Sequence, residues 1–177
     1  TMSARPVVVY VHTGSFLPPP LNGSCMGAKL DSNVVETCTR LAKMGYVAAA
    51  IDYRLGWNPV GDQDTRTGTL INAVYRGIQD TKNAVRFFRW SVDSLSNQFA
   101  VNPDKISLMG QGSGGYIVLA YASLDKGPEI TLPKFTNASN GEPYVDTTLS
   151  GNFDGTNNTP LNIANFPTII LFIFLSP

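Results

Sequence analysis

The sequence predicts an α/β fold, a mostly parallel sheet with flanking helices. Three apolar runs, at 6–11, 46–54 and 105–109, lack the alternation of a half-exposed strand and suit strands buried on both faces. Segments with a helical spacing of apolar residues lie between them, over 34–44 and 70–94. Strand, helix and strand in succession form βαβ units, which imply parallel pairing and right-handed crossovers.

Composition and charge limit the class of protein. The chain has 177 residues, of which 43% are hydrophobic, and this is enough for one domain with a core over 1–177. It carries 13 basic and 13 acidic residues, so its formal net charge is zero. We therefore expect no nucleic-acid partner and no anionic-membrane partner, and a small neutral or weakly polar ligand fits better.

The first strand is expected at Pro6–Val11, a short run rich in β-branched residues. It leads into His12-Thr13-Gly14-Ser15-Phe16. The next segment, Leu17–Gly23, contains consecutive prolines, which lack a backbone donor and fix φ. This segment is therefore predicted to be a loop over the sheet edge.

A crossover helix and a second strand should follow. Asp31–Asn33 can cap a helix over Val34–Met44, and Gly45 ends it. Tyr46–Arg54 then has the composition of a buried strand. Together with the first strand, these segments complete a βαβ unit.

A long polar loop is expected over Leu55–Thr69, and loops of that length often border a site. A second helix is predicted from about Leu70 to Ser94. Phe99–Asp104 should be a turn, and Lys105–Met109 should be the third strand.

A glycine turn follows this third strand. Gly110-Gln111-Gly112-Ser113-Gly114-Gly115 has four glycines in six residues and precedes an apolar segment that suits a packed helix, Tyr116–Ala122. Glycines allow positive φ and the close approach of a helix to a strand. The pattern indicates a sharp strand-to-helix turn that contains the hydroxyl of Ser113.

The C-terminal third has a different composition. Residues 127–165 are predicted to be a loop-rich insertion, because Asn, Thr, Gly and Pro dominate this stretch. Phe166–Leu175 is an apolar run too short to span a bilayer, and it is expected to be a fourth parallel strand. A truncated or frameshifted reading frame is the other interpretation of this run. Exposed sheet edges would invite self-association.

The chain resembles the α/β-hydrolases, specifically the esterase and lipase branch close to hormone-sensitive-lipase-like and carboxylesterase-like domains. Four stretches carry the resemblance in the right order: His12–Phe16, Gly45–Leu55, Asp80–Arg89, and Asn102–Ile106 with the glycine turn. The resemblance implies the central part of an α/β-hydrolase fold in a single, apparently truncated domain. It also implies a carboxylic ester hydrolase that acts on a small-molecule ester without a cofactor or a metal.

The resemblance assigns roles to individual residues. Ester cleavage needs a serine nucleophile, N–H donors for the oxyanion, a histidine base and an orienting carboxylate. Ser113 is the candidate nucleophile. The oxyanion loop would comprise His12, Gly14 and Ser15, with Gly114 as a further donor. The elbow glycines would be Gly110, Gly112 and Gly115.

The elbow departs from the family pattern in its register. A gapless alignment with Gly-x-Ser-x-Gly places Gly110 and Gly114 on the two glycines, which puts Gly112 in the nucleophile position and Ser113 one residue late. The alternative register centres Ser113 and places Gln111 at a crowded position. The sequence favours the first register, in which the elbow has no nucleophile at its centre.

The base is the second departure. His12 is the only histidine, and the family uses a histidine at this position to shape the oxyanion loop. A structural role is therefore expected for it. Asp146 and Asp154 are candidate acids by residue type alone, and both lie in turn-like sequence, so neither receives a role.

Two other functions are open from the sequence. A catalytically inactive α/β-hydrolase homologue could act as a ligand-binding or interaction module. Gly110-x-Gly112-x-x-Gly115 also matches the dinucleotide fingerprint formally. That fingerprint belongs after the first strand of its unit, whereas this one follows the third predicted strand, so this interpretation is disfavoured.

Cysteines and sequons bear on the location of the protein. Cys25 and Cys38 match no metal pattern and form either a loop-closing disulfide or two reduced core thiols. Sequons occur at Asn22, Asn137 and Asn157. These features leave a secreted or periplasmic location open, and no signal peptide is visible in this chain.

Overall fold

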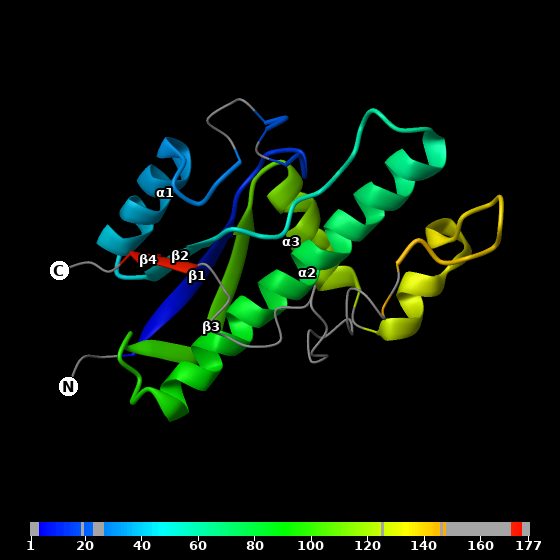
Figure 1. Cartoon of the computed structure of the whole chain (residues 1–177). Helices are drawn as coiled ribbons and strands as arrows, with labels where there is room; N and C mark the ends of the chain where they lie inside the picture. The colour runs from blue at the N-terminus through cyan, green and yellow to red at the C-terminus, as the bar shows by residue number, and fades with distance from the viewer. Residues whose placement is uncertain are drawn as a thin grey trace.

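The computed structural model describes residues 4–18, 20–22, 27–124, 126–145, 147 and 171–174. Within these residues the strands are β1 (Arg5–Val11), β2 (Val47–Ile51), β3 (Val101–Gly110) and β4 (Leu171–Phe174). The helical elements are α1 (Ser32–Lys43), α2 (Gln63–Ser94), α3 (Ser113–Ser123) and two short 3-10 turns, η1 (Gly127–Thr131) and η2 (Pro133–Phe135). Figure 1 shows their arrangement, which confirms the predicted α/β class.

The sheet has the order β3-β1-β2-β4, and β1 runs parallel to both of its neighbours. Val9 of β1 is aligned with Ala49 of β2 and with Leu108 of β3. All residues of β2 are buried, as expected for a parallel strand covered on both faces. The carboxyl ends of β1 and β3 meet where Val11 is aligned with Gly110.

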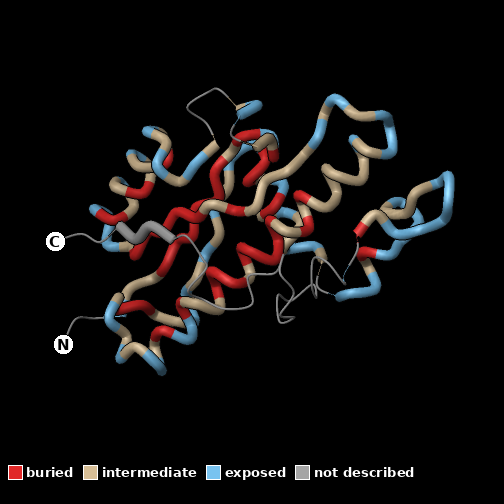
Figure 2. Tube along the Cα trace, viewed as in Figure 1, coloured by how far each residue is buried: buried red, intermediate tan, exposed pale blue. Residues whose placement is uncertain are grey.

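Helices cover both faces of the sheet, with α1 on one face and α2 and α3 on the other (Figure 1). Successive β1 side chains alternate between two hydrophobic cores. Val9 packs in the larger core with Phe88 of α2, and Tyr10 packs in the smaller core with Val34 and Cys38 of α1. Figure 2 shows buried residues concentrated along β1 and β2 and along the part of α2 that packs on the sheet.

The first helix begins earlier than the sequence indicated, at Ser32. Asp31 precedes it at the predicted cap position, but its carboxylate caps no N–H of α1. It accepts hydrogen bonds from the backbone N–H groups of Gly27 at 2.5 Å and Ala28 at 2.9 Å. The carboxylate therefore ties the preceding loop to the start of α1. Cys38, on the buried face of α1, is a free thiol, and Cys25 lies outside the described residues.

The second helix also begins earlier than predicted. It starts at Gln63, so much of the expected loop over Leu55–Thr69 is helical. The carboxylate of Asp62 accepts a hydrogen bond from the N–H of Thr65 at 2.8 Å, which satisfies an orphan donor in the first turn. This cap outweighs the weak helix propensities of the threonines and Gly68 that follow.

The third strand is longer than predicted, because it includes most of the expected turn over Phe99–Asp104. Asn97 holds its start, since its amide oxygen accepts from Val101 N–H and its amide nitrogen donates to the Val101 carbonyl. A register irregularity against β1 absorbs the extra residues that include Pro103. Proline is tolerated there because β3 is an edge strand of the described sheet.

The fourth strand was predicted to be parallel, and this was wrong. Leu171–Phe174 pairs with β2 in the antiparallel direction, with Ala49 aligned with Ile173. An apolar run without alternation indicates a strand but carries no information about its direction. The rest of the run over 166–175 lies outside the described residues.

The segment after α3 packs beside the N-terminal half of α2 (Figure 1). It contains η1, η2 and an isolated antiparallel bridge between Thr136 and Pro143. It is the described part of the predicted insertion over 127–165. Among the described helices, none combines the length and apolar character needed to cross a bilayer.

Candidate active site

Gly110 and Gly114 allow the backbone of the glycine turn to pack closely, and Gly114 also lets the turn approach the end of β1. A side-chain carbon on Gly114 would collide with the carbonyl oxygen of Val11 and would lie 2.6 Å from that of His12. A side-chain carbon on Gly110 would collide with the Gly114 backbone. Such contacts leave no room for any side chain. Gly115 differs, because a carbon added there would make an ordinary contact of 3.5 Å with the Gly110 carbonyl oxygen.

Gly112 is the apex of the turn between β3 and α3. It has φ 54° and ψ −121°, in the left-handed region that favours glycine. A side-chain carbon on Gly112 would point at the hydroxyl end of Thr13 and collide with it. The apex therefore faces the loop 12–16 that follows β1.

The side chain of Gln111 leaves the turn on the other side. Its amide oxygen accepts hydrogen bonds from the Tyr10 hydroxyl at 3.1 Å and from the Asn33 amide at 3.1 Å. The backbone of Gln111 also contributes, since its carbonyl accepts from Gly114 N–H at 3.0 Å. The Gly114 N–H, one of the expected oxyanion donors, is thus engaged within the turn.

Ser113 is the first residue of α3, and only 5% of its surface is exposed. Its hydroxyl lies 2.9 Å from the Tyr53 hydroxyl, which itself donates to the His12 carbonyl at 3.1 Å. Because the Tyr53 proton is directed at His12, the Ser113 hydroxyl donates to Tyr53. Burial raises the pKa of Tyr53 to about 12, so the phenol is neutral at physiological pH.

His12 is fully buried in the loop and stacks on Tyr53, with ring centroids 4.5 Å apart. Its Nδ1 lies 2.5 Å from the carbonyl oxygen of Thr13 and must carry the ring proton to donate to it. Burial lowers the pKa of His12, which favours the neutral ring. Its Nε2 has no hydrogen-bond partner among the described residues and lies 3.5 Å from Asp52 Oδ1. The His12 ring thus has a structural role in the loop 12–16.

Asp52 binds Lys29, which belongs to the loop before α1, at the same end of the sheet. Its carboxylate accepts from the backbone N–H of Lys29 at 2.7 Å and from the Lys29 ammonium at 2.5 Å. Sequence patterns alone did not identify Lys29, Asp52 and Tyr53 as site residues. A signal for the last two was present, because polar residues that end a buried parallel strand lie beside the loops of the neighbouring strands.

The loop 12–16 has an unusual backbone that curves it toward the apex. Gly14 has φ 125°, and the next two residues, Ser15 and Phe16, have φ 56° and 59°. The Phe16 carbonyl accepts from the N–H groups of Gly56 and Trp57, both at 3.0 Å. These bonds join the loop after β1 to the loop after β2.

A buried ion pair holds the loop after β2 on α2. The guanidinium of Arg54 donates to Asp80 Oδ1 at 2.8 Å and 3.0 Å, and its backbone N–H donates to Asp80 Oδ2 at 2.8 Å. Burial raises the pKa of Asp80, although Arg54 opposes this shift. Asp80 is 3% exposed and its carboxylate is bound by Arg54, so we assign it a structural role.

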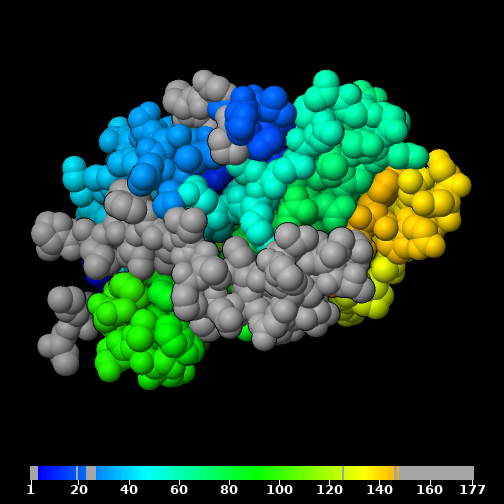
Figure 3. Space-filling view, in the orientation of Figure 1, coloured from blue at the N-terminus to red at the C-terminus, as the bar shows by residue number. Residues whose placement is uncertain are grey.

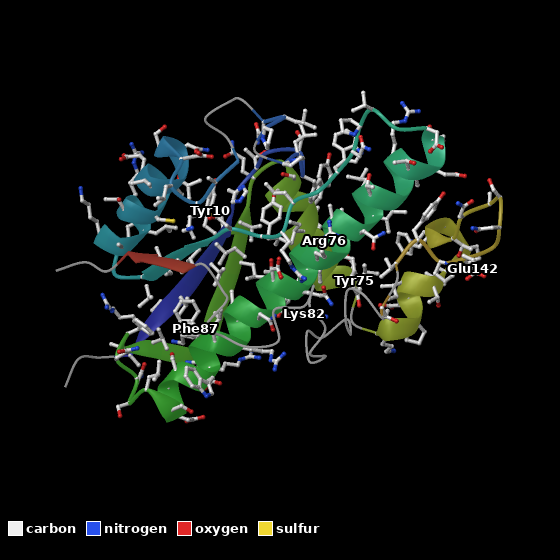
Figure 4. The ribbon with its side chains drawn as sticks, in the orientation of Figure 1. Tyr10, Tyr75, Arg76, Lys82, Phe87 and Glu142 are labelled. Carbon is white, nitrogen blue, oxygen red and sulfur yellow. The ribbon has the colours of Figure 1, made fainter. Side chains whose placement is uncertain are left out.

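A cavity of about 640 Å³ opens at the junction of the turn and the loop 12–16. The hydroxyl-bearing residues Thr13, Ser15 and Ser113 lie at this end of it. Apolar side chains of α2 and α3 line much of the rest, together with the Tyr75 side chain, which Figure 4 labels on α2. No charged side chain is among the described residues that line the cavity. The site suits an uncharged, largely apolar ligand with one polar end.

The structure thus brings the predicted site residues together at the carboxyl ends of β1 and β3. They are His12, Gly14, Ser15, Gly110, Gly112, Ser113, Gly114 and Gly115. Asp146 and Asp154 lie outside the described residues. In the part of the chain that the structure describes, no group of His, Cys, Asp and Glu could hold a metal ion.

A strand-to-helix glycine turn beside the loop after an early strand, on a mostly parallel sheet, is the arrangement of the α/β-hydrolase esterases. Comparison with protein families agrees with this class. The BD-FAE family, an α/β-hydrolase-type esterase family, matches residues 1–150, and the chain belongs to this family.

A curated relative adds less detail. "Protein usf" of Aquifex pyrophilus is 29% identical over 117 residues, which are 66% of this chain and 45% of that protein. The chain therefore matches less than half the length of this relative. No solved structure matches the chain significantly.

Proposed function

We propose that this chain acts as a carboxylic ester hydrolase on an uncharged ester whose acyl group enters the apolar cavity. The observation that carries the proposal is the position of Ser113, which lines the cavity where the turn meets the loop 12–16. Membership of an esterase family supports the reaction class. The narrower hormone-sensitive-lipase-like or carboxylesterase-like assignment stays part of the proposal.

In this proposal the Ser113 hydroxyl turns from Tyr53 toward the cavity, and its oxygen attacks the ester carbonyl while water takes its proton. The C–O bond to the alcohol then breaks and the alcohol leaves with a proton from water. A second water molecule hydrolyses the acyl-serine, which releases the acid and restores the Ser113 hydroxyl. The backbone N–H groups of Gly14 and Ser15 would stabilise the oxyanion, because they belong to the loop that faces the apex. The N–H of Gly114 could join them only if its bond to the Gln111 carbonyl opened.

The expected rate of ester hydrolysis is limited because no histidine is free to act as the base. His12 is the only histidine in the sequence, and its ring is committed to Thr13 and Tyr53. The neutral phenol of Tyr53 is a poor proton acceptor. Binding and an oxyanion hole without a complete triad accelerate acyl transfer by about 10³–10⁴-fold over water. We expect an acceleration of this order for the chain as it stands.

Hydrolysis of nitrophenyl butyrate by matched serine variants tests the proposal. Ser113→Ala should hydrolyse the ester more slowly than the wild type, and the rate that remains above that of buffer measures the contribution of binding and the oxyanion donors alone. Ser123→Ala is the control, because Ser123 lies on an exposed part of the same helix, where its hydroxyl donates to the Leu119 carbonyl. Equal rates for the wild type and Ser113→Ala would reject Ser113 as the nucleophile.

One observation favours a second function, ligand binding without turnover. Gly112, not Ser113, occupies the left-handed apex of the turn, where this class of enzyme places its nucleophile. A chain that binds a methyl ketone analogue of the ester but does not accelerate hydrolysis above buffer would support this second function.

Self-association through an exposed sheet edge is a further part of the proposal. β3 is an edge strand of the described sheet, and Met109 on it is 43% exposed. Unpaired edges favour pairing between copies. Light scattering coupled to gel filtration should show a dimer or a larger species, and a strictly monomeric protein would contradict this expectation.

A further inference from the structure

The end of the cavity away from the turn is formed by a segment that the catalytic proposal does not use. This segment, residues 126–145, contributes Ile130, Phe135 and Val145 to the cavity lining. Ile130 and Val145 are each only 6% exposed. Figure 3 shows the segment, in yellow, packed against the surface of α2. We refer to residues 126–145 as the cap segment.

Polar contacts fasten the cap segment to the first turns of α2. The Asn72 amide donates to the Tyr144 carbonyl at 2.6 Å and to the Gly68 carbonyl at 2.8 Å. Both carboxylate oxygens of Asp64 accept from the cap segment, one from the Ser139 hydroxyl at 3.2 Å and the other from the Tyr144 hydroxyl at 3.4 Å. These three hydrogen bonds hold the cap segment against the first turns of α2.

Gly68 makes this fit possible. A side-chain carbon added there would lie 3.1 Å from the ring of Tyr144, which is tighter than an ordinary contact. The ring thus lies directly over the helix backbone. Glycine destabilises the interior of a helix. The position of Gly68 under Tyr144 gives it a packing role, because the missing side chain leaves room for the ring.

We propose that the cap segment sets the length of the acyl group that the cavity accepts. This inference rests on the proposed function. Ile130 and Phe135 act as specificity-determining residues, and the contacts of Asp64 and Asn72 with the cap segment hold them in place. The acyl group is uncharged and apolar, because no described lining residue is charged. The polar contacts with α2 lie outside the cavity lining and do not bind the ligand.

Binding of non-hydrolysable ester analogues tests the proposal independently of turnover. Linear 2-alkanones of about four to twelve carbons can be titrated against a Trp90→Phe protein, in which Trp57 of the cavity lining is the one remaining tryptophan. Affinity should rise by about fourfold for each methylene until the alkyl chain of the ketone reaches the cap segment, and should then level off. We call the ketone length at which it levels off the plateau.

Two variants of the cap segment change the length of the cavity in opposite directions. Ile130→Phe should move the plateau to shorter ketones, and Phe135→Ala should move it to longer ones. Leu132→Phe is the matched control, because Leu132 lies on the same segment, is 42% exposed and is absent from the cavity lining. It should leave the plateau unchanged.

A second pair of variants tests the polar contacts. In Asp64→Ala, affinity should no longer level off at a defined ketone length, because the cap segment loses two hydrogen bonds to α2. Glu142→Ala is the control, since this exposed acid of the cap segment, labelled in Figure 4, is outside the cavity lining. Circular dichroism should verify that each variant is folded.

The outcomes separate this inference from the proposed function. An unchanged plateau in folded Ile130→Phe and Phe135→Ala, or no ketone binding at any length, would overturn the inference even if hydrolysis depends on Ser113. A shifted plateau in a protein that does not hydrolyse esters would support the inference and reject the enzymatic step.

Discussion

The hydroxyl groups of Tyr53 and Ser113 lie 2.9 Å apart beneath the strand-to-helix turn, although 60 residues separate them in the sequence. The same tyrosine hydroxyl donates to the His12 carbonyl. One side chain just after the end of β2 therefore joins the helix that carries the candidate nucleophile to the loop after β1.

Removing the Tyr53 hydroxyl should destabilise the fold. In Tyr53→Phe the buried Ser113 hydroxyl loses its partner, and an unsatisfied buried polar group costs about 1–3 kcal/mol. Urea denaturation should show a fall of this size in the free energy of unfolding. Tyr116→Phe is the control, because Tyr116 is 67% exposed on the same helix. Equal stability of both variants would show that the Tyr53 hydroxyl has no structural role.

Adjacent glycines of the turn should respond differently to alanine. Gly114→Ala places a methyl group against the Val11 and His12 carbonyl oxygens, which are backbone atoms and cannot swing away. We expect a loss of about 3 kcal/mol or more, or no folded protein. Gly115→Ala meets only an ordinary contact and should be neutral or stabilising by up to about 1 kcal/mol. Similar melting temperatures for the two variants would contradict this packing.

The stability of the protein should depend on pH through His12. Burial lowers the pKa of His12 below its ordinary value of 6.5. The unfolded chain then binds more protons than the folded chain just below pH 6.5, so the free energy of unfolding falls as the pH falls through that region. The contribution is fully present above pH 6.5 and is lost toward the lower pKa of the folded state.

Two measurements check this dependence. The single histidine can be titrated by NMR, and its pKa in the folded protein should lie below 6.5. His12→Asn, whose amide can replace the Nδ1–H donor, should lose less stability between about pH 7 and pH 5 than the wild type does. This comparison isolates His12 from Asp80, whose raised pKa acts in the opposite direction. A pKa at or above 6.5 would be inconsistent with the buried neutral ring.

The Cys38 thiol should be unreactive in the folded protein. It is fully buried, and burial raises its pKa to about 11 from 9.0, which lowers the thiolate population by about a hundredfold. In a Cys25→Ser background, reaction with a disulfide reagent should be at least about a hundredfold slower in buffer than in denaturant. Comparable rates would place Cys38 at the surface.

Local patterns predicted much of the fold. The β-branched run that forms β1, the helix after Asp31 and the glycine turn are signals within short segments, and each element formed at or close to its expected place, although α1 begins earlier, at Ser32. The start of α2 was missed because it depends on a single capping hydrogen bond, which the Asp62 carboxylate accepts from the Thr65 N–H. The direction of β4 was missed because an apolar run does not encode direction.

The site was less predictable, for a related reason. Glycine and serine spacing in the sequence is enough to mark the turn and the loop 12–16. The partners of these residues come from elsewhere in the chain: Tyr53 meets Ser113, and Lys29 meets Asp52. Contacts of this kind depend on the parallel register of β1 with β2 and β3, which composition and periodicity do not specify.

Covalent labelling of the folded protein with a fluorophosphonate, followed by peptide mapping, tests the role of Ser113 most directly. We expect a single adduct on Ser113, absent in Ser113→Ala and slowed by a 2-alkanone that occupies the cavity. A folded protein that forms no adduct, or one that is modified at Thr13 or Ser15 instead, would contradict the assignment of Ser113 as the nucleophile.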